Sequence, residues 1–251
     1  MLVLALDTTT RQGSIALTRD GALLATYVGD AAITHGERLP GDLVQVLDAH
    51  GVRVSDVDVF AVAAGPGSFT GLRIGIATMQ GLALANEKPL VGVSALDAIR
   101  QAVSSALSPQ PSALSPGDEV AVWMDAQRGQ VFSAVYGARD VVEAALVDKP
   151  ADILRRWAHA RTHPRAFAGD GAIAYRDLIR AAIADAVIIE PLPPLAPAIA
   201  LAAAAHVGEH GASAPDAIRP IYIRRSDAEL ARDRKADLEV STTLDRSSAD
   251  L

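Results

Sequence analysis

A glycine-rich stretch is the part of the chain whose residue types and spacing could act most directly in chemistry. It lies between an apolar run at 57–64 and a helical pattern at 72–86, and it reads Gly65-Pro66-Gly67-Ser68-Phe69-Thr70-Gly71-Leu72-Arg73-Ile74-Gly75. Its glycines allow backbone angles that a Cβ forbids, and Ser68 or Thr70 can cap the helix that follows. Backbone N–H groups at such a helix start can bind an anion. The alternative is a tight turn that lets helix and strand pack closely.

The spacing of these glycines differs from that of the common nucleotide-binding loops. A Walker A loop ends in Gly-Lys-Ser or Gly-Lys-Thr, whereas Gly71 is followed by Leu72 and Arg73. In the dinucleotide fingerprint the third glycine comes one residue earlier than it does here. We therefore interpret the stretch first as a structural motif, with packing favoured over anion binding; its defining residues are Gly65, Gly67, Ser68, Thr70 and Gly71.

Two aspartates each follow a strand-like apolar run, Asp7 after residues 2–6 and Asp125 after residues 120–124. With Thr8, they are the candidates for binding a cofactor through its phosphate or metal ion. The alternative is that each aspartate caps its own turn, which is a common role for this residue type. Two-metal nuclease chemistry would need more carboxylates beside Asp7, and the segments that follow supply none in a suitable place.

Two histidine pairs have the spacing of metal ligands. The run from His206 to His210 matches the H-x-x-E-H pattern of zinc proteases, and His159 and His163 are four residues apart. A zinc site needs firm helix and a third protein ligand, but Gly208 interrupts the first pair and Pro164 follows the second. No Gly-x-Ser-x-Gly motif marks a serine nucleophile. We expect neither a metal site nor a catalytic nucleophile.

Composition narrows the class of protein. The chain has 251 residues, a net charge of −7 and no cysteine. The negative charge argues against a broad nucleic-acid-binding surface, and the lack of cysteine excludes disulfides and thiolate chemistry. No stretch approaches the about 20 apolar residues of a membrane helix, and the N-terminal apolar run is too short for a signal peptide. We expect a cytoplasmic protein without a membrane span.

The pattern of apolar residues and turns gives the same order of elements twice. In the first half it predicts strands at 2–6, 14–18, 22–28, 57–63 and 90–93, with helices at 37–49, 72–86 and 94–106. In the second half it predicts strands at 120–124, 130–136, 141–147, 165–168 and 186–189, with helices at 150–160, 173–184 and 197–207. Each half therefore has the order βββαβαβα.

A repeated βββαβαβα unit predicts an α/β protein made of two ribonuclease-H-like lobes, the actin-like and sugar-kinase-like (ASKHA) architecture. We expect a first lobe at 1–106, a linker at 107–119, a second lobe at 120–225 whose last helix packs back on the first, and a flexible tail at 226–251. In ATP-using proteins of this architecture, the turns that hold Asp7 and Asp125 meet the phosphates or their metal ion.

Two helices of the first lobe carry apolar stripes, with Leu39, Leu43 and Val46 on the first and Leu72, Gly75, Ile76 and Met79 on the second. Sequence alone favours burial of both stripes in the monomer core. The alternative is that part of each is exposed and forms an interface with a partner protein. Gly71 and Gly75 are four residues apart and would allow a neighbouring helix to approach closely.

Several motifs together resemble the bacterial TsaB (YeaZ) family over about residues 1–225. The glycine stretch is the most specific of them, and the others are Leu4-Ala5-Leu6-Asp7-Thr8-Thr9, Gln80-Gly81-Leu82-Ala83, Gly92-Val93-Ser94, Asp125-Ala126-Gln127-Arg128-Gly129-Gln130-Val131 and Pro220-Ile221-Tyr222-Ile223-Arg224. The resemblance implies a role in making N6-threonylcarbamoyladenosine at position 37 of tRNA. It implies a non-catalytic scaffold subunit, which docks on the metal-bearing transferase TsaD together with the ATPase TsaE.

The resemblance also implies self-association of the isolated protein, or pairing with TsaD, through first-lobe helices. The resemblance therefore favours an interface role for the seven stripe residues. In that case Ile76→Glu with Met79→Glu should abolish the complex while leaving the fold intact. The resemblance implies that the isolated subunit binds no cofactor and that ATP or ADP is a candidate ligand at the junction of the complex. It also implies that this chain contacts tRNA only through the complex. His35 and His50 are too far apart to replace the first-lobe histidine pair of TsaD. The alternatives are an ATP-dependent small-molecule kinase and a homodimeric regulator.

Overall fold

The computed structural model describes residues 1–106, 118–138, 140–160, 162–211 and 214–224. Met1–Ile221 form one compact unit. The expected linker lies outside the described residues except for Asp118 and Glu119, and the expected tail lies outside them entirely.

The first sheet has five strands in the order β3-β2-β1-β4-β5. Its central strand β1 pairs antiparallel with β2 and parallel with β4. Every residue of β1 is buried because the sheet is covered on both faces at that point. The strands are β1 (Leu2–Asp7), β2 (Ser14–Arg19), β3 (Ala22–Val28), β4 (Val59–Gly65) and β5 (Leu90–Ser94).

The second sheet repeats this arrangement, with the order β10-β9-β6-β7-β8. Its central strand β6 pairs antiparallel with β7 and parallel with β9. The strands are β6 (Val120–Asp125), β7 (Val131–Tyr136), β8 (Val141–Asp148), β9 (Ala166–Ala168) and β10 (Val187–Ile188). The equivalent strand order in two five-stranded sheets confirms the predicted duplicated, actin-like α/β architecture.

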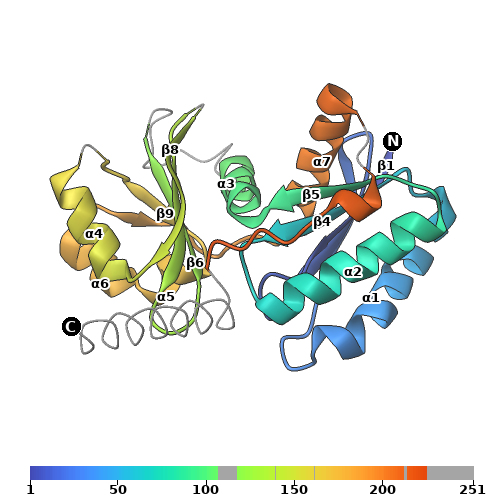
Figure 1. Cartoon of the computed structure of the whole chain (residues 1–251), viewed down its shortest axis with the longest axis horizontal. Helices are drawn as coiled ribbons and strands as arrows, with labels where there is room; N and C mark the ends of the chain where they lie inside the picture. Colours follow the sequence, from blue (N-terminus) through green and yellow to red (C-terminus); the bar gives the residue numbers. More distant parts are fainter. Residues whose placement is uncertain (107–117, 139, 161, 212–213, 225–251) are drawn as a thin grey trace, which may run out of the picture. The chain divides into compact units, whose positions relative to one another are not determined.

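Seven described α-helices connect and cover the strands (Figure 1). They are α1 (His35–Ala49), α2 (Phe69–Ala85), α3 (Ala95–Ala106), α4 (Pro150–His159), α5 (Asp170–Ala174), α6 (Arg176–Ala182) and α7 (Ala196–His210). The single helix predicted at 173–184 is wrong, because Tyr175 leaves helical geometry at φ −106° and ψ 23° and separates α5 from α6. The strand-like piece predicted at 220–224 forms no strand, although the Ile221 N–H donates to the Ala64 carbonyl at 2.7 Å.

Helices α1 and α2 lie side by side on one face of the first sheet, and α7 contacts β1, β2, β4 and β5 on the other (Figure 1). The face of α7 toward that sheet is lined mostly by alanine, so the helix can approach closely; the buried residues are Ala196, Ala198, Ile199, Ala200 and Ala203. The last described α-helix, α7, therefore completes the core around the first sheet.

The core beside the second sheet contains three aromatic side chains. Trp123 contacts Phe167 edge-on at 5.5 Å between ring centroids and lies 5.9 Å from Trp157. The Trp157 indole N–H donates to Glu143 Oε2 at 2.9 Å, so this buried polar group has a partner. Aromatic side chains are few in this chain, and clustering them here supplies a large share of the buried apolar area of this core.

Candidate functional site

The glycine stretch forms the turn between β4 and α2. Gly65 has φ +118°, and a Cβ at this position would lie 2.7 Å from the Ile221 carbonyl oxygen. Ser68 is the N-cap of α2, because its Oγ accepts a hydrogen bond from the Gly71 N–H at 3.3 Å. Helix α2 therefore begins at Phe69, earlier than the apolar pattern predicts, and Thr70 is an exposed residue of its first turn.

The glycines after Gly65 make room for the turn that follows β1. A Cβ on Gly67 would lie 2.6 Å from Thr9 Cβ, and one on Gly71 would lie 2.1 Å from the Thr8 carbonyl oxygen. A Cβ on Gly75 would lie 2.1 Å from Thr8 Oγ1. The expectation that Gly71 and Gly75 face a neighbouring helix is therefore wrong: the segment that packs against them is the β1–β2 turn, residues 8–13.

Backbone N–H groups of the turn already have partners. The Ser68 N–H donates to the Thr9 carbonyl at 2.9 Å, and the Leu72 N–H donates to the Ser68 carbonyl at 2.8 Å. The Gly71 N–H, one of the first-turn donors that an anion at the helix start would need, donates to Ser68 Oγ. The geometry favours packing as the purpose of the stretch.

Of the three cofactor candidates, Asp7 and Thr8 are buried. Asp7 Oδ1 accepts hydrogen bonds from the Thr9 N–H at 2.8 Å and from the Thr9 hydroxyl at 2.6 Å. Thr8 Oγ1 packs against Gly75 and has no hydrogen-bond partner. Asp125 accepts from the backbone and side chain of Gln127, at 2.9 and 2.7 Å. Both aspartates therefore cap the turns that follow their strands.

The structure adds one carboxyl group that the residue pattern does not single out. Asp170, at the start of α5, accepts hydrogen bonds from the Asp125 N–H at 3.0 Å and from the Gly171 N–H at 2.9 Å. Its charge contributes to raising the pKa of Asp7, although burial of Asp7 is the larger cause. Burial also raises the pKa of Asp170. The Gly169-Asp170-Gly171 sequence after a short strand was the signal available for it.

Replacing Asp7 with Asn is expected to flatten the dependence of stability on pH. Because the pKa of Asp7 is raised, the folded protein binds this proton more tightly than the unfolded chain. The free energy of unfolding therefore falls as pH rises from the ordinary pKa of 3.8 through the raised pKa. Asn does not titrate, and its amide oxygen can still accept from Thr9, so urea unfolding across the acid-to-neutral range should show a smaller decrease for Asp7→Asn.

The control for this experiment has the opposite sign. Hydrogen bonds from Arg53 lower the pKa of Asp56, so its contribution to stability is present above the ordinary pKa and lost in acid. Asp56→Asn should therefore lower stability at neutral pH slightly. Identical pH profiles for wild type and Asp7→Asn would contradict the assignment of Asp7 as a carboxyl group that favours its neutral form.

The seven residues expected at a partner interface all lie in the first-lobe core. Their exposed fractions do not exceed 5% for the six apolar side chains, and Gly75 is buried under Thr8. The alternative that part of these stripes is exposed is therefore wrong. The helical period marks the faces that α1 and α2 turn toward the first sheet. The residues that belong to the core and not to an exposed interface are Leu39, Leu43, Val46, Leu72, Gly75, Ile76 and Met79.

The opposite sides of α1 and α2 carry a second set of apolar and small residues, which we call the outer face. Val44 and Leu84 are each 57% exposed and Phe69 is 47% exposed. Gly41 and Gly81 lie inside their helices with nothing within 4 Å of a Cβ placed on them. The outer face comprises Pro40, Gly41, Val44, Phe69, Ala77, Gly81 and Leu84.

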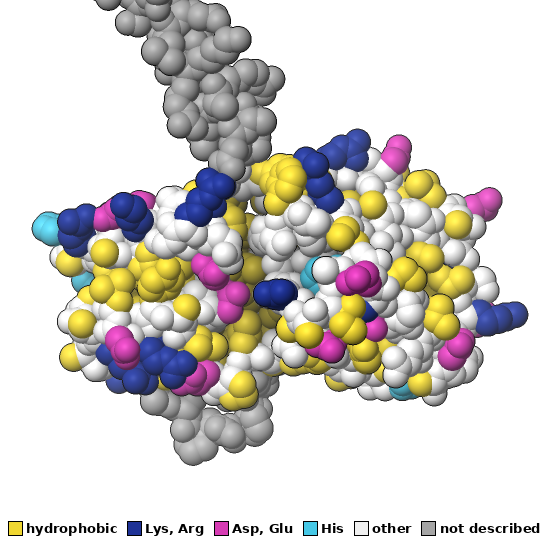
Figure 2. All heavy atoms as spheres, turned by 90° about the horizontal axis from the view of Figure 1, so that it is seen from below, with side chains coloured by type: hydrophobic (Ala, Val, Ile, Leu, Met, Phe, Trp, Pro, Cys, Tyr) yellow, Lys and Arg dark blue, Asp and Glu magenta, His cyan; other side chains and the backbone are white. Residues whose placement is uncertain are grey.

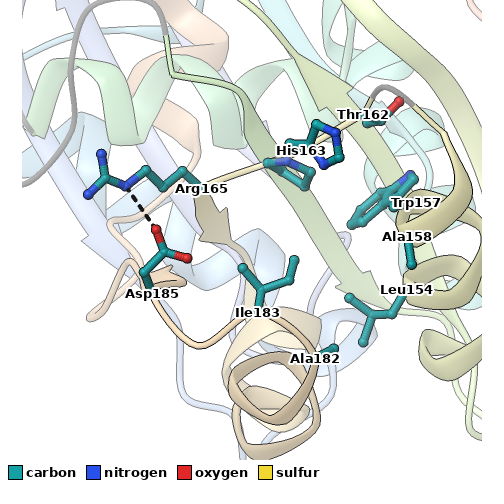
Figure 3. A pocket seen from close by; sticks show the side chains of 10 residues that line it. Leu154, Trp157, Ala158, Thr162, His163, Arg165, Ala182, Ile183 and Asp185 are labelled. Carbon is teal, nitrogen blue, oxygen red and sulfur yellow. Dashed lines mark ion pairs between the residues drawn. The ribbon is translucent and has the colours of Figure 1, made fainter.

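A separate hollow of about 350 Å³ lies beside α4 and α6 (Figure 3). Leu154, Trp157 and Ile183 line its apolar part, and Arg165 pairs with Asp185 at 3.6 Å near His163. The four-residue spacing suggests that His163 pairs with His159, but His159 Nδ1 contacts the carbonyl oxygen of Arg155 at 2.7 Å. His163 therefore lines this hollow, and His159 does not.

Both histidines of the other pair, His206 and His210, lie on α7. The rings of His206 and His210 stack on α7 at 4.9 Å between centroids. Among the residues that the structure describes, no group of three or more His, Asp or Glu side chains is placed to hold a metal ion. Nor is any helix in the described part of the chain long and apolar enough to cross a membrane.

Comparison with known proteins identifies the family. The family model of TsaD, tRNA N6-adenosine threonylcarbamoyltransferase, matches residues 29–232, and TsaB from Escherichia coli is 35% identical over 136 residues. The chain belongs to the family of TsaD and TsaB (YeaZ) proteins. The match to E. coli TsaB covers 54% of this chain and 55% of the relative, so the chain spans about half the length of that curated relative.

One solved structure and one sequence relative match the chain over more of its length. YeaZ from Pseudomonas aeruginosa has a TM-score of 0.68 and 28% identity, and the match covers 88% of this chain and 99% of that one. An uncharacterised protein from Mycobacterium tuberculosis is 32% identical over 231 residues, which is 90% of this chain and 93% of the relative. The fold of the TsaB/YeaZ group therefore extends over both lobes.

Proposed function

We propose that this chain is a TsaB-type subunit for synthesis of N6-threonylcarbamoyladenosine in tRNA, and that it acts as a non-catalytic scaffold for TsaD. The observation that carries the proposal, beyond family membership, is the outer face of α1 and α2. A side chain at either of its two mid-helix glycines, Gly41 and Gly81, would meet nothing within 4 Å in the monomer. Glycine inside a helix nevertheless lowers helix stability by about 1 kcal/mol relative to alanine. Close approach of a helix of a partner protein would explain why glycine occupies both positions.

The contacts of the β1–β2 turn support a non-catalytic role. Asp7 and Asp125 cap their own turns, and Thr8 is covered by α2. In this proposal the isolated subunit binds no cofactor, and ATP or ADP binds only at the junction with TsaD. TsaE joins the same complex. In the absence of TsaD the outer face pairs two copies of this chain.

Charge supports indirect contact with tRNA. The net charge is −7, and Figure 2 shows Lys and Arg side chains mixed with acidic and hydrophobic ones over the face that it draws. A protein that binds nucleic acid by itself usually gathers its basic side chains in a patch. In the proposed function, the complex with TsaD supplies the contact with tRNA.

The test is light scattering on a size-exclusion column with TsaD from the same organism. Alone, the chain should elute as a homodimer; with TsaD it should form a heterocomplex that replaces the homodimer. Formation of threonylcarbamoyladenosine in tRNA should then require this chain together with TsaD and TsaE. Failure to form a complex with nucleotide and TsaE present would contradict the proposal, and stoichiometric, magnesium-dependent ATP binding by the isolated chain would favour a small-molecule kinase.

A further inference from the structure

The β1–β2 turn is held from one side by α2. The Thr9 carbonyl accepts the Ser68 N–H at 2.9 Å, and Thr8 lies so close to Gly71 and Gly75 that neither position has room for a Cβ. Close packing of this kind leaves few alternative positions for the turn. Its first half is therefore placed by α2.

The same turn is held from the other side by α1. His35 Nε2 lies 2.8 Å from the Thr10 carbonyl oxygen, and Arg38 donates to the Gln12 carbonyl and to Asp42. Arg38 Nη2 also lies 3.0 Å from His35 Nδ1. A guanidinium can only donate, so Nδ1 accepts and Nε2 carries the proton that is donated to Thr10. The contact with Arg38 thus fixes the tautomer that His35 needs.

The buried sides of α1 and α2 belong to one core cluster, which contains Leu43 of α1 and Met79 of α2. Gly36 and Ile74 face each other, with 3.9 Å between a Cβ placed on Gly36 and Ile74 Cδ1. Both helices also contact residues 8–13, through side chains from α1 and through close backbone approach from α2. Together with the shared core, this turn therefore fixes the relative position of the two helices.

We propose that the β1–β2 turn sets the spacing of α1 and α2, and hence the shape of the outer face, with His35 as a positioning residue for partner docking. This inference rests on the proposed function. A docking surface that is already in its bound shape loses less freedom on association and binds more tightly. Loosening the turn should weaken docking, although Thr8 and Thr9 are buried and do not reach the outer face.

The test compares two substitutions of His35 by calorimetric titration with TsaD. His35→Ala removes the donor to Thr10, and we expect about tenfold weaker binding, the effect of about one hydrogen bond. His35→Gln keeps an N–H donor of similar reach and should bind within about threefold of wild type, since only positioning is required. Loss of binding in both variants would indicate direct contact of the ring with TsaD and would overturn the inference.

A variant of the outer face separates this inference from the proposed function. If Ala77→Glu with Gly81→Glu abolishes binding while His35→Ala binds like wild type, docking stands and the role of the turn fails. If the outer-face variant binds normally, both fail. A second measurement needs no substitution. Hydrogen exchange at Thr9 and Gly13, whose N–H groups donate to Asp7 Oδ1 and to Thr10 Oγ1, should slow when TsaD binds. Unchanged exchange at both amides would also overturn the inference.

Discussion

Gly71→Ala is expected to lose about 3 kcal/mol of folding stability, or not to fold at all, because its Cβ would overlap backbone. The methyl group would lie 2.1 Å from the carbonyl oxygen of Thr8, in the turn that follows the central strand β1. Either α2 or the turn must move, and both are packed into the first-lobe core. Urea unfolding followed by circular dichroism measures the loss.

Gly75→Ala provides the matched comparison, because its obstacle is a side chain. The added Cβ would lie 2.1 Å from Thr8 Oγ1, but 3.2 Å from Thr8 Cβ. Thr8→Ala removes the oxygen and should cost little by itself, since this buried hydroxyl has no hydrogen-bond partner.

The resulting double-mutant cycle has a clear sign. Thr8→Ala should restore Gly75→Ala to within about 1 kcal/mol of wild type, whereas it should not restore Gly71→Ala, whose obstacle is the Thr8 carbonyl. Equal rescue of both variants, or rescue of neither, would contradict the packing of α2 against the β1–β2 turn.

The second large effect concerns partner binding. Ala77→Glu with Gly81→Glu places two charges on the outer face, where both positions are exposed. We expect at least about a hundredfold weaker binding to TsaD, since unpaired charges buried in an interface cost several kcal/mol. The melting temperature should stay the same or rise, because replacing an exposed helix glycine favours the helix.

Ile76→Glu with Met79→Glu is the comparison variant on the same helix. The sequence-based expectation was a loss of binding with the fold intact. The structure corrects it, because Ile76 is 4% exposed and Met79 is fully buried. Two charges in the first-lobe core should unfold the protein. A folded Ile76→Glu/Met79→Glu protein that fails to bind TsaD, beside an outer-face variant that binds normally, would return the interface to the original stripe.

The sequence by itself determined the elements and their duplication. Turn residues and apolar periodicity are local, so the two βββαβαβα orders and the strand-to-helix turn at Gly65 could be predicted from neighbouring residues. The break between α5 and α6 could not be predicted for the same reason. The apolar pattern continues through Tyr175, whereas the helical backbone geometry does not.

Only the tertiary structure decided what each motif faces. The apolar stripes of α1 and α2 were recognised, but a period of 3.6 residues does not say whether a stripe meets its own sheet or a partner. The space left by Gly71 and Gly75 is filled by Thr8, far away in sequence, and Asp7 lies close enough to Asp170 of the other lobe for the two charges to interact. Such pairings depend on how the sheets and helices pack together, because burial and steric exclusion act between residues that local sequence does not connect.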